Sequence, residues 1–316
     1  MAKEKFVIEM GSSNTVIYKM GYGIVLREPS IVAINKYNSK EYEVGFVAKK
    51  MQGKIDDSFL IVEPISHGVV TDERMAGLML HGFLNKVCEN RGSAEVTFCV
   101  SIGLSDNELL AFKNVAYANN ITIVRFENVC LAGLKGANVN IAKSSAVGCI
   151  NLGGGTSNFA VISLDKTTQG FSVDFGGKEI DNAIIDYFKA IKNVEFSPLV
   201  AEKIKNDCGS LYTQDTTNIE ITGVDLDTKK PVTEIISAIE VREAMIEFFE
   251  RIKQAMEHLL YNCSADIIND ITKNGIYIIG GLANMTGLEN YLTRKLNIPI
   301  YIPDEPENCT VQGVSE

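Results

Sequence analysis

The sequence predicts an α/β protein of two lobes, each a mixed β-sheet with flanking helices, with a cleft between the lobes. Two observations lead to this fold class. The chain has 316 residues, and a single hydrophobic core rarely grows beyond about 250–300 residues. In addition, the strand–turn–strand pattern at the start of the chain returns almost midway along it. Hydrophobic residues make up 46% and charged residues 22% of the chain, an ordinary balance for a globular protein.

The repeated pattern is the most informative of these features. Its first copy is Val7-Ile-Glu-Met-Gly-Ser-Ser-Asn14 followed by Val16-Ile17, and its second is Cys149-Ile-Asn-Leu-Gly-Gly-Gly-Thr-Ser-Asn158 followed by Ala160-Val-Ile162. Both copies contain a strand, an acidic or amide residue, an apolar residue, glycine, a small polar turn and a second strand. Two related hairpins imply two related lobes, each with its own sheet.

Further strands follow the first hairpin. The hairpin strands are Phe6–Glu9 and Thr15–Tyr18, and a third strand, Ile24–Leu26, leads into Ile31–Ile34. Pro29 stands between the last two and cannot donate a hydrogen bond to a neighbouring strand. The sequence therefore predicts a sheet edge or a bend at Pro29.

Capping patterns mark the start of two helices. Ser105 with Glu108, and Thr286 with Glu289, both have the spacing of a capping box, in which the two side chains satisfy backbone N–H groups at the helix start. Apolar residues at helical spacing follow both patterns, so each pair predicts a helix beginning at that point.

Two more helices are expected in the second half of the chain. Ser197 as N-cap, Pro198 at the first helical position and Gly209 beyond the end indicate a short helix through Lys205. A long amphipathic helix is expected over about residues 233–260. Its apolar face would consist of Ile236, Ile239, Met245, Phe248, Phe249, Ile252, Met256, Leu259 and Leu260.

Composition excludes several classes of function. The net charge of −10 argues against a nucleic-acid partner, which needs clustered Lys and Arg. The start of the chain lacks the pattern of a secretory signal, and no apolar run approaches the roughly 18 residues of a membrane span. We therefore expect a cytoplasmic protein.

The cysteine and histidine residues show no metal or catalytic pattern. The seven cysteines contain no C-x-x-C pair and are odd in number, which predicts reduced and mostly buried thiols. His67, His81 and His258 are far apart in the sequence, so neither a zinc site nor a Ser-His-Asp triad is indicated.

Small residues at the two hairpin turns are typical of anion binding. Glycine lacks Cβ, so successive backbone N–H groups can approach a phosphate closely. Either turn alone also fits an ordinary tight turn, and only the paired occurrence favours a polyphosphate held between the lobes. The residues concerned are Gly11, Ser12, Ser13 and Asn14 in the first turn, and Gly153, Gly154, Gly155 and Thr156 in the second.

A third glycine element is the segment Gly275-Ile-Tyr-Ile-Ile-Gly280-Gly281-Leu-Ala283. A buried strand that ends in two glycines offers bare backbone on which a flat base or a ribose can rest. Strand, Gly-Gly and helix is also a common packing arrangement. Its position after two phosphate hairpins favours the nucleotide interpretation.

This order of elements resembles the superfamily of actin, sugar kinases and heat-shock chaperones. Within it, the chain resembles the MreB/Mbl-type bacterial actin homologues over about residues 6–313. The segments that carry the resemblance are Gly21-Tyr-Gly-Ile-Val-Leu-Arg-Glu-Pro-Ser-Ile-Val-Ala-Ile34, Gly68-Val-Val, Gly153-Gly-Gly-Thr-Ser-Asn-Phe-Ala-Val-Ile-Ser163, Gly177-Lys-Glu-Ile-Asp-Asn-Ala-Ile-Ile185 and Ala201-Glu-Lys-Ile-Lys205.

The resemblance implies an actin-like fold with ATP and Mg²⁺ in the cleft. It also implies head-to-tail filaments that organise cell-wall synthesis and cell shape. Lobe I would comprise residues 1–142 and lobe II residues 143–310, while residues 311–316 return toward lobe I, where the C-terminal helix of the family is missing. Carried over to this chain, ribose and base contacts come from Glu202, Lys205 and Asp207, and the adenosine strand supplies Gly280, Gly281, Leu282 and Ala283.

The resemblance is broken at three catalytic positions. Glu9 and Asn151 stand where the family has aspartates that hold Mg²⁺ through water, and asparagine is only a neutral ligand. The water-activating glutamate of the family, in a Glu-Glu-Pro element, aligns with Asn128, and an amide cannot take a proton from water. Glu127 beside it would point to the opposite face of its strand. Glu9, Glu127, Asn128 and Asn151 therefore form a degenerate catalytic set, which predicts retained nucleotide binding with weak or absent hydrolysis.

Expected partners also follow from the resemblance. They are further copies of the chain, an active MreB paralogue and wall-synthesis membrane proteins. The short N-terminus and the polar loop Cys88–Glu95 argue against direct insertion into the membrane, so attachment to its inner face would depend on partners.

Three other functions are compatible with parts of this pattern. One is a scaffold that binds nucleotide and polymerises without turnover, which the altered carboxylates favour. The second is a small-molecule kinase of the same superfamily, which would need a carboxylate base for a substrate hydroxyl, and the sequence shows none. The third, a chaperone, would need a peptide-binding domain after the second lobe.

Overall fold

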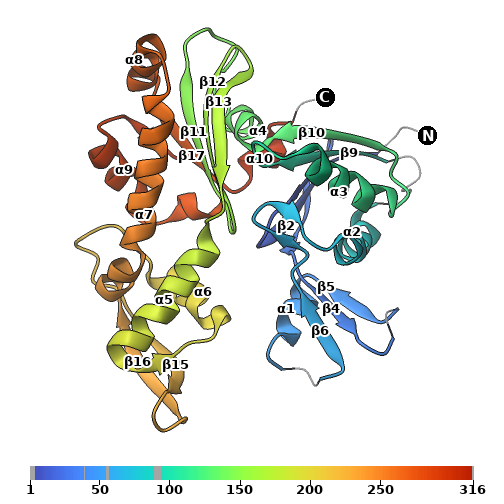
Figure 1. Ribbon diagram of the computed structural model, residues 1–316, viewed down its shortest axis with the longest axis vertical. Coiled ribbons are helices and arrows are strands. Elements are labelled where there is room, and N and C mark those ends of the chain that lie inside the picture. Colours follow the sequence, from blue (N-terminus) through green and yellow to red (C-terminus); the bar gives the residue numbers. More distant parts are fainter. Residues whose placement is uncertain (1–3, 39, 55–56, 89–93, 315–316) are drawn as a thin grey trace.

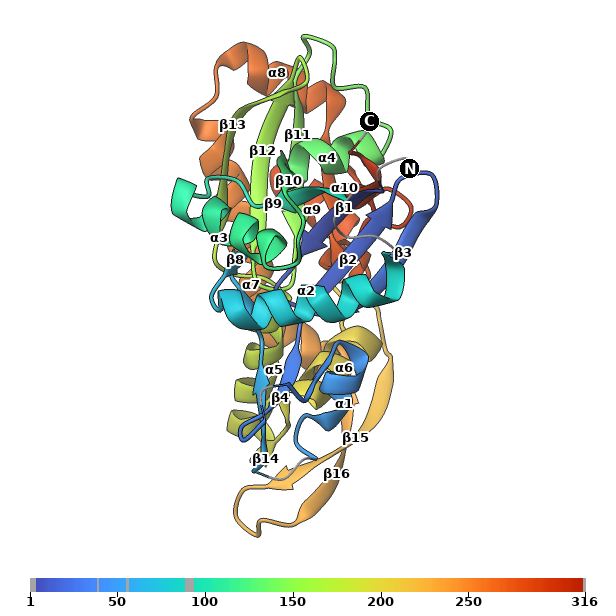
Figure 2. The same ribbon diagram turned by 90° about the vertical axis from the view of Figure 1, so that its right-hand side faces the viewer.

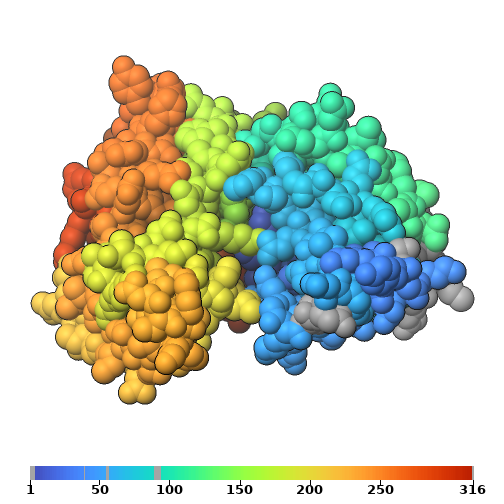
Figure 3. Space-filling model, turned by 60° about the horizontal axis from the view of Figure 1, so that its bottom comes forward, coloured from blue at the N-terminus to red at the C-terminus, as the bar shows by residue number. Residues whose placement is uncertain are grey.

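Two lobes lie side by side in the computed structural model, which describes residues 4–38, 40–54, 57–88 and 94–314 (Figure 1). Each lobe has a five-stranded sheet in its upper half and a three-stranded sheet in its lower half in this view. Seen from below, the two lobes meet along a furrow that runs between the blue and the yellow parts of the surface (Figure 3).

The first large sheet begins with the predicted hairpin. Its strands are β1 (Lys5–Met10), β2 (Asn14–Lys19), β3 (Gly23–Pro29), β9 (Glu95–Val100) and β10 (Ile123–Asn128), in the order β10-β9-β1-β2-β3. β1 pairs antiparallel with β2 and parallel with β9, so the sheet is mixed, as expected. β3 is an edge strand that ends at Pro29, which confirms the prediction made for this proline.

The second large sheet repeats this topology. Its strands are β11 (Val147–Leu152), β12 (Ser157–Ser163), β13 (Lys166–Val173), β17 (Ile276–Ile279) and β18 (Ile300–Tyr301), in the order β13-β12-β11-β17-β18. β11 pairs antiparallel with β12 and parallel with β17. Each hairpin thus has one antiparallel neighbour on one side and two parallel strands on the other, and the predicted relationship between the lobes extends to whole sheets.

Alternating side chains of β1 divide the core of the first lobe into two parts. Phe6 and Ile8 face the helices α2 (Glu73–Val87) and α3 (Asp106–Tyr117), whereas Val7 on the opposite face packs with α4 (Val129–Gly136). This is the period of two that a strand requires.

A core shared by both lobes joins the two large sheets. It contains Val7 and Val16 from the first sheet, Cys149 and Ala160 from the second, and residues of α4 and α10 (Cys309–Gln312). α4 contacts β10, β11, β12 and α10, and α10 contacts β1 and β2. The predicted lobe boundary at 142/143 and the predicted return of residues 311–316 toward lobe I both stay predictions.

The smaller sheets were not predicted, apart from one strand, Ile31–Ile34, which corresponds to β4 (Val32–Asn35). The first consists of β4, β5 (Tyr42–Val44) and β6 (Phe59–Val62), beside α1 (Phe46–Met51), and the second of β14 (Val194–Glu195), β15 (Asn218–Asp225) and β16 (Pro231–Ser237), beside α5 (Gly177–Lys192) and α6 (Pro198–Cys208). They lie below the large sheets, and α1 faces α6 across the furrow (Figures 1 and 2).

Two helix predictions need correction. The long helix α7 (Ala238–Tyr261) begins at a Ser237–Glu240 capping box, not near residue 233, because residues 231–237 pair with β15 as strand β16. Ile236 therefore lies on that strand, and Ile239 is 48% exposed instead of facing the core. α6 is three residues longer than predicted, while its predicted caps Ser197 and Gly209 are confirmed.

The predicted capping box at Thr286 is wrong. α9 (Leu288–Leu296) starts after Gly287, which is left-handed (φ 81°), and no side chain caps it. Thr286 instead bridges to Ser210, and its carbonyl accepts a hydrogen bond from the Leu211 N–H at 2.8 Å. The capping box at Ser105 and Glu108 is present at the start of α3.

All seven cysteines are free thiols, and five of them are buried. Within the described part of the chain, no helix has the length and apolarity that crossing a membrane requires.

The expected polar loop between Cys88 and Glu95 lies outside the described residues at positions 89–93. The remaining elements are α8 (Ala265–Asn274), a 3₁₀ turn η2 (Gly281–Asn284) and a small hairpin of β7 (Ile65–Ser66) and β8 (Val69–Val70).

Candidate functional site

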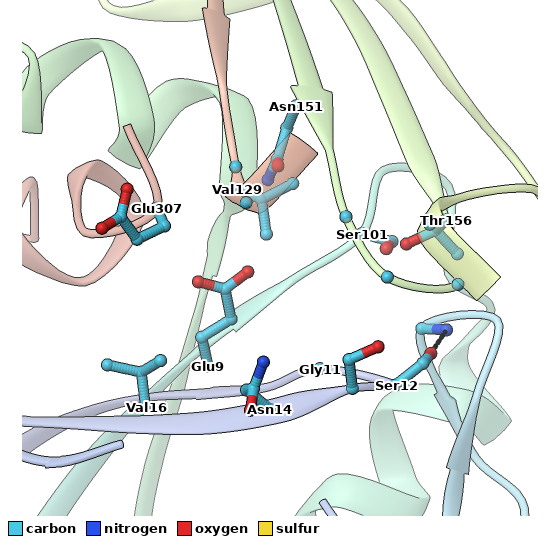
Figure 4. A pocket seen from close by; sticks show the side chains of 18 of the residues that line it. Glu9, Gly11, Ser12, Asn14, Val16, Ser101, Val129, Asn151, Thr156 and Glu307 are labelled. Atoms are coloured by element: carbon cyan, nitrogen blue, oxygen red, sulfur yellow. Dashed lines mark hydrogen bonds between the residues drawn. The ribbon is translucent and has the colours of Figure 1, made fainter. Parts of the chain in front are cut away.

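A cavity lies between the lobes where the turns of the two hairpins face each other (Figure 4). All the residues predicted for the two phosphate turns line it, and so do most of the other predicted site residues. Those that line it are Glu9, Gly11, Ser12, Ser13, Asn14, Asn151, Gly153, Gly154, Gly155, Thr156, Lys205, Gly280, Gly281 and Leu282. Glu127, Asn128, Glu202, Asp207 and Ala283 do not.

The two hairpin turns are closed by equivalent hydrogen bonds. The Gly11 N–H donates to the Asn14 carbonyl at 3.0 Å, and the Gly153 N–H donates to the Thr156 carbonyl at 2.9 Å. The sequence repeat therefore corresponds to a repeat of backbone geometry, which places both turns in the same way relative to their sheets.

The second turn is held by the start of α5. The N–H groups of Gly177 and Lys178 donate to the carbonyls of Gly153 and Gly154 at 3.0 and 2.8 Å. In a planar trans peptide the C=O and the following N–H point in opposite directions. The N–H groups of Gly154 and Gly155 consequently point away from α5 and are available to an anion in the cavity.

Close approach of the turns explains the need for glycine. A Cβ on Gly154 would lie 2.0 Å from Ser13 Oγ, and a Cβ on Gly155 would lie 2.6 Å from Ser12 Oγ. Real Cβ atoms do not come this close to other heavy atoms, so any side chain at these positions would push the two lobes apart.

A third turn, between β7 and β8, touches both hairpins and was missed by sequence reasoning. The Gly68 N–H donates to Ser12 Oγ at 3.2 Å, drawn as the dashed line in Figure 4, and His67 Nδ1 lies 3.1 Å from the Gly155 carbonyl oxygen. His67 has a positive φ of 48°, which is uncommon for a residue with a side chain. That backbone conformation cannot be recognised from sequence, and the segment Gly68-Val-Val was noted only as part of the family resemblance.

The opposite end of the cavity contains Glu9, Asn151 and Val129. Glu9 and Asn151 point toward one another from the two hairpins, and Val129 lies close to both in Figure 4. Burial raises the pKa of the Glu9 carboxyl from 4.5 to about 7, although the Arg27 guanidinium acts to lower it. Asn151 is buried, and its Oδ1 lies where a Cβ on Gly280 would be 2.5 Å away.

Asn128 and Glu127, predicted as altered catalytic residues, have structural contacts outside the cavity. Asn128 is the N-cap of α4, and its Oδ1 accepts hydrogen bonds from the N–H groups of Cys130 (2.8 Å) and Leu131 (3.2 Å). Glu127 Oε1 accepts from the Asn128 N–H at 2.9 Å. Val129, one position after Asn128, is the residue of this segment that lines the cavity.

Of the three residues predicted on α6, only Lys205 lines the cavity. Lys205 Nζ lies 2.8 Å from Asp181 Oδ1 and donates to the Gly177 carbonyl at 3.1 Å. Burial raises the pKa of Asp181, against the lowering effect of Lys205. Glu202 instead forms an ion pair of 2.6 Å with Lys49 of α1 in the other lobe, and Asn206, not Asp207, completes the lining.

The strand predicted to contact adenosine borders the cavity through Gly280, Gly281 and Leu282. Gly280 has a positive φ of 89°, and a Cβ there would lie 2.4 Å from the Leu152 carbonyl oxygen. Gly281 has open space beside it, as a contact surface for a flat ring requires. Ala283 is buried in the core of the second lobe.

The side chains at this end of the cavity offer fewer acidic ligands for a magnesium ion than a pair of carboxylates would. Mg²⁺ prefers oxygen ligands, usually one or two carboxylates plus water and phosphate oxygens. The hairpins offer one carboxylate, Glu9, whose counterpart in the repeat is the neutral Asn151, and Val129 beside them offers no donor. Among the described residues, no three His, Cys, Asp or Glu side chains gather where they could hold a metal.

Comparison with known proteins gives consistent results. A family model described as MreB/Mbl protein matches residues 3–316. The cell shape-determining protein MreB of Escherichia coli (strain K12) is 31% identical over 314 residues, which cover 97% of this chain and 90% of the relative. The cell shape-determining protein Mbl of Bacillus subtilis (strain 168) is 29% identical over 309 residues, which cover 97% of this chain and 93% of the relative.

Solved structures confirm the actin-like two-lobe fold. MreB5 of Spiroplasma citri bound to AMPPNP has a TM-score of 0.94 at 27% identity, covering 99% of this chain and 95% of that one. The same protein bound to ADP gives 0.92. The MamK double helical filament gives 0.82 at 16% identity, covering 98% and 97% of the two chains, a likeness that concerns the fold alone.

Proposed function

The chain belongs to the MreB/Mbl protein family, and from this we propose that it is an ATP-binding, filament-forming protein of the bacterial cytoskeleton that serves cell shape and the organisation of wall synthesis. The observation that carries nucleotide binding is the cavity lined by both phosphate turns and by Gly280 and Gly281. Support comes from MreB5 of Spiroplasma citri, which was solved with AMPPNP and with ADP.

A matched pair of glycine variants tests nucleotide binding. Gly154→Ala places a Cβ 2.0 Å from Ser13 Oγ in the cavity, whereas Gly77→Ala on α2 places one at an ordinary 3.8 Å from Ala118 Cβ. Calorimetric titration with ATP should show at least a tenfold loss of affinity for the first variant and no change for the second. Equal affinity in both variants would remove the phosphate-turn assignment.

Hydrolysis is proposed to be weak or absent. A general base typically contributes 10²–10⁴-fold to a rate, and Val129 is the residue of the segment 127–129 that lines the cavity with Asn151 and Glu9. Valine cannot accept a proton. This favours, as a second candidate, a scaffold that binds nucleotide and polymerises, or co-polymerises with an active paralogue, without turnover.

Self-assembly is proposed to be head to tail, because a contact between unlike surfaces that does not close into a ring produces a filament. Sedimentation and electron microscopy with ATP, ADP and a non-hydrolysable analogue test it. Monomers in all conditions at high concentration would leave only co-polymerisation with a paralogue, which mixing with an active MreB would then reveal. We propose a cytoplasmic location, with wall-synthesis partners placing the filaments at the inner face of the membrane.

A further inference from the structure

A positively charged side chain, Arg27, lies at the end of the cavity that contains Glu9 and Asn151. In the register of the first sheet Glu9 is opposite Val16, and Val16 is opposite Arg27. Residues directly opposite one another in a sheet share a face, and all three line the cavity. A guanidinium stays charged at every working pH, so Arg27 contributes a permanent positive charge to this wall.

The Arg27 side chain is held by residues near the C-terminal end of the chain. Its Nη2 donates to the Glu307 carbonyl at 3.2 Å and also to Asn308 Oδ1. Both bonds come from one nitrogen, and a guanidinium has five N–H donors. The group is therefore fixed in place with donors left for a ligand, and contacts between guanidinium and phosphate are among the stronger hydrogen bonds in proteins.

Asn151, on the opposite wall of the cavity, also provides hydrogen-bond donors for an anion. An ionised carboxylate only accepts hydrogen bonds, whereas a side-chain amide also has two N–H donors. Position 151 can thus donate to a phosphate oxygen. The other cavity carboxylate, Glu307, accepts a hydrogen bond of 2.9 Å from Asn284 Nδ2. Glu9 is the acidic side chain at the end of the cavity that would hold a metal, and Arg27 and Asn151 supply hydrogen-bond donors for an anion there.

We infer that this chain does not require a divalent metal ion to bind its nucleotide phosphates, because Arg27 provides positive charge at the place of the metal. The inference rests on the proposed function, because it concerns the same cavity and the same ligand class. It specifies the charged state of that ligand: free ATP, not only the magnesium complex, is bound.

The test compares ATP binding in EDTA with binding in excess Mg²⁺, measured by calorimetry on the full chain. Wild type should show dissociation constants within about threefold of each other. Arg27→Gln should weaken binding of metal-free ATP at least tenfold. Arg125→Gln is the matched control, since Arg125 lies on β10 of the same sheet with its side chain 65% exposed and away from the cavity lining, and it should behave as wild type.

A second variant, with a gained response to Mg²⁺, tests the inference even if Arg27→Gln does not fold. Asn151→Asp restores a carboxylate, which repels metal-free ATP, so its binding should become at least tenfold tighter with Mg²⁺ than in EDTA. Arg27→Lys keeps the charge and should retain binding in EDTA.

The outcomes separate the inference from the proposed function. Binding of ATP by wild type only when Mg²⁺ is present would overturn the inference and leave the proposed function intact. Unchanged affinity of a folded Arg27→Gln variant in EDTA would also overturn it. Absence of binding under both conditions would remove the proposed function together with the inference.

Discussion

At the scale of single residues, the proposal that the cavity lacks a general base can be tested directly. Val129 lines the cavity, whereas Asn128 caps α4. Val129→Glu combined with Asn151→Asp should therefore raise the rate of phosphate release, by about 10- to 100-fold if the new carboxylate accepts a proton from water. Asn128→Glu with Asn151→Asp should not, and the loss of the cap should cost about 1 kcal/mol of stability.

A steady-state phosphate-release assay decides which position can hold a general base. It compares wild type, the single variants at positions 129 and 151, and both double variants. Residues that act as a unit are not additive, so either single variant alone is expected to change little. A faster rate for the Asn128 pair than for the Val129 pair would contradict the geometry described above.

The one-residue difference shows what a single sequence withholds. Asparagine after a strand is both a candidate for a catalytic position and a good helix cap, and only the three-dimensional path of the chain separates the two roles. The same holds for His67, whose contact with Gly155 depends on a positive φ, and for Arg27, which meets Asn308 across more than 280 positions of sequence. The glycine turns were predictable because close backbone approach itself requires glycine.

Glu9 makes the stability of the nucleotide-free protein depend on pH. Its pKa is raised by burial from 4.5 to about 7. Between these values the folded protein holds a proton that the unfolded chain has released, so stability falls as pH rises through this window. Glu9→Gln removes the charge and should stabilise the protein at pH 8 by about 1–3 kcal/mol, with little effect at pH 4.5.

Urea unfolding of wild type and Glu9→Gln at both pH values, without nucleotide, measures this difference. Glu4 serves as a control position, because it pairs with Lys19 outside the cavity. A Glu9→Gln variant whose stability follows wild type across the whole range would show that the carboxyl titrates normally.

At the scale of elements, two identical sequence patterns have different consequences. Ser105 accepts a hydrogen bond from the Glu108 N–H and its own N–H is bonded by the Glu108 side chain, whereas Thr286 is exposed and caps nothing. Ser105→Ala should therefore lower the free energy of unfolding by about 0.5–2 kcal/mol. Thr286→Ala should change it by less than about 0.5 kcal/mol, within the range of ordinary surface substitutions.

Chemical denaturation of the two variants makes the comparison, and equal losses would mean that α9 is capped by Thr286 after all. The error in the sequence prediction has a physical cause. Gly287 lies against the backbone of Leu211 and Tyr212, where a Cβ would approach within 2.7 Å, and this tertiary contact sets the start of the helix. In the same way, strand pairing with β15 takes residues 231–237 away from the periodic stretch that continues as α7.

At the scale of the whole molecule, the duplicated hairpin was enough to predict two lobes, because each copy generates the same strand order around itself. The smaller sheets escaped prediction because β5 and β14 have only three and two residues, and because β16 overlaps the periodic stretch from which a helix was predicted. These sheets and their helices carry two ion pairs that cross the furrow: Lys49 with Glu202 at 2.6 Å and Lys178 with Glu63 at 2.5 Å. The shared core around α4 joins the lobes on the opposite side.

This arrangement predicts that the ion pairs limit how fast nucleotide enters and leaves. Neither Lys178 nor Glu63 lines the cavity, so Lys178→Ala should act on lobe opening and not on contacts with the ligand. A half-exposed pair contributes up to about 1 kcal/mol, which corresponds to an increase of about two- to fivefold in both association and dissociation rates with little change in affinity. Stopped-flow fluorescence with a labelled ATP measures the rates.

The charge-swapped double variant Lys178→Glu with Glu63→Lys should return the rates toward wild type. Lys253→Ala, which removes an ion pair within α7 alone, should leave them unchanged. Rates that are the same in wild type and Lys178→Ala would show that the lobes open without breaking this contact, and nucleotide exchange would then be governed by the contacts of the phosphate turns themselves.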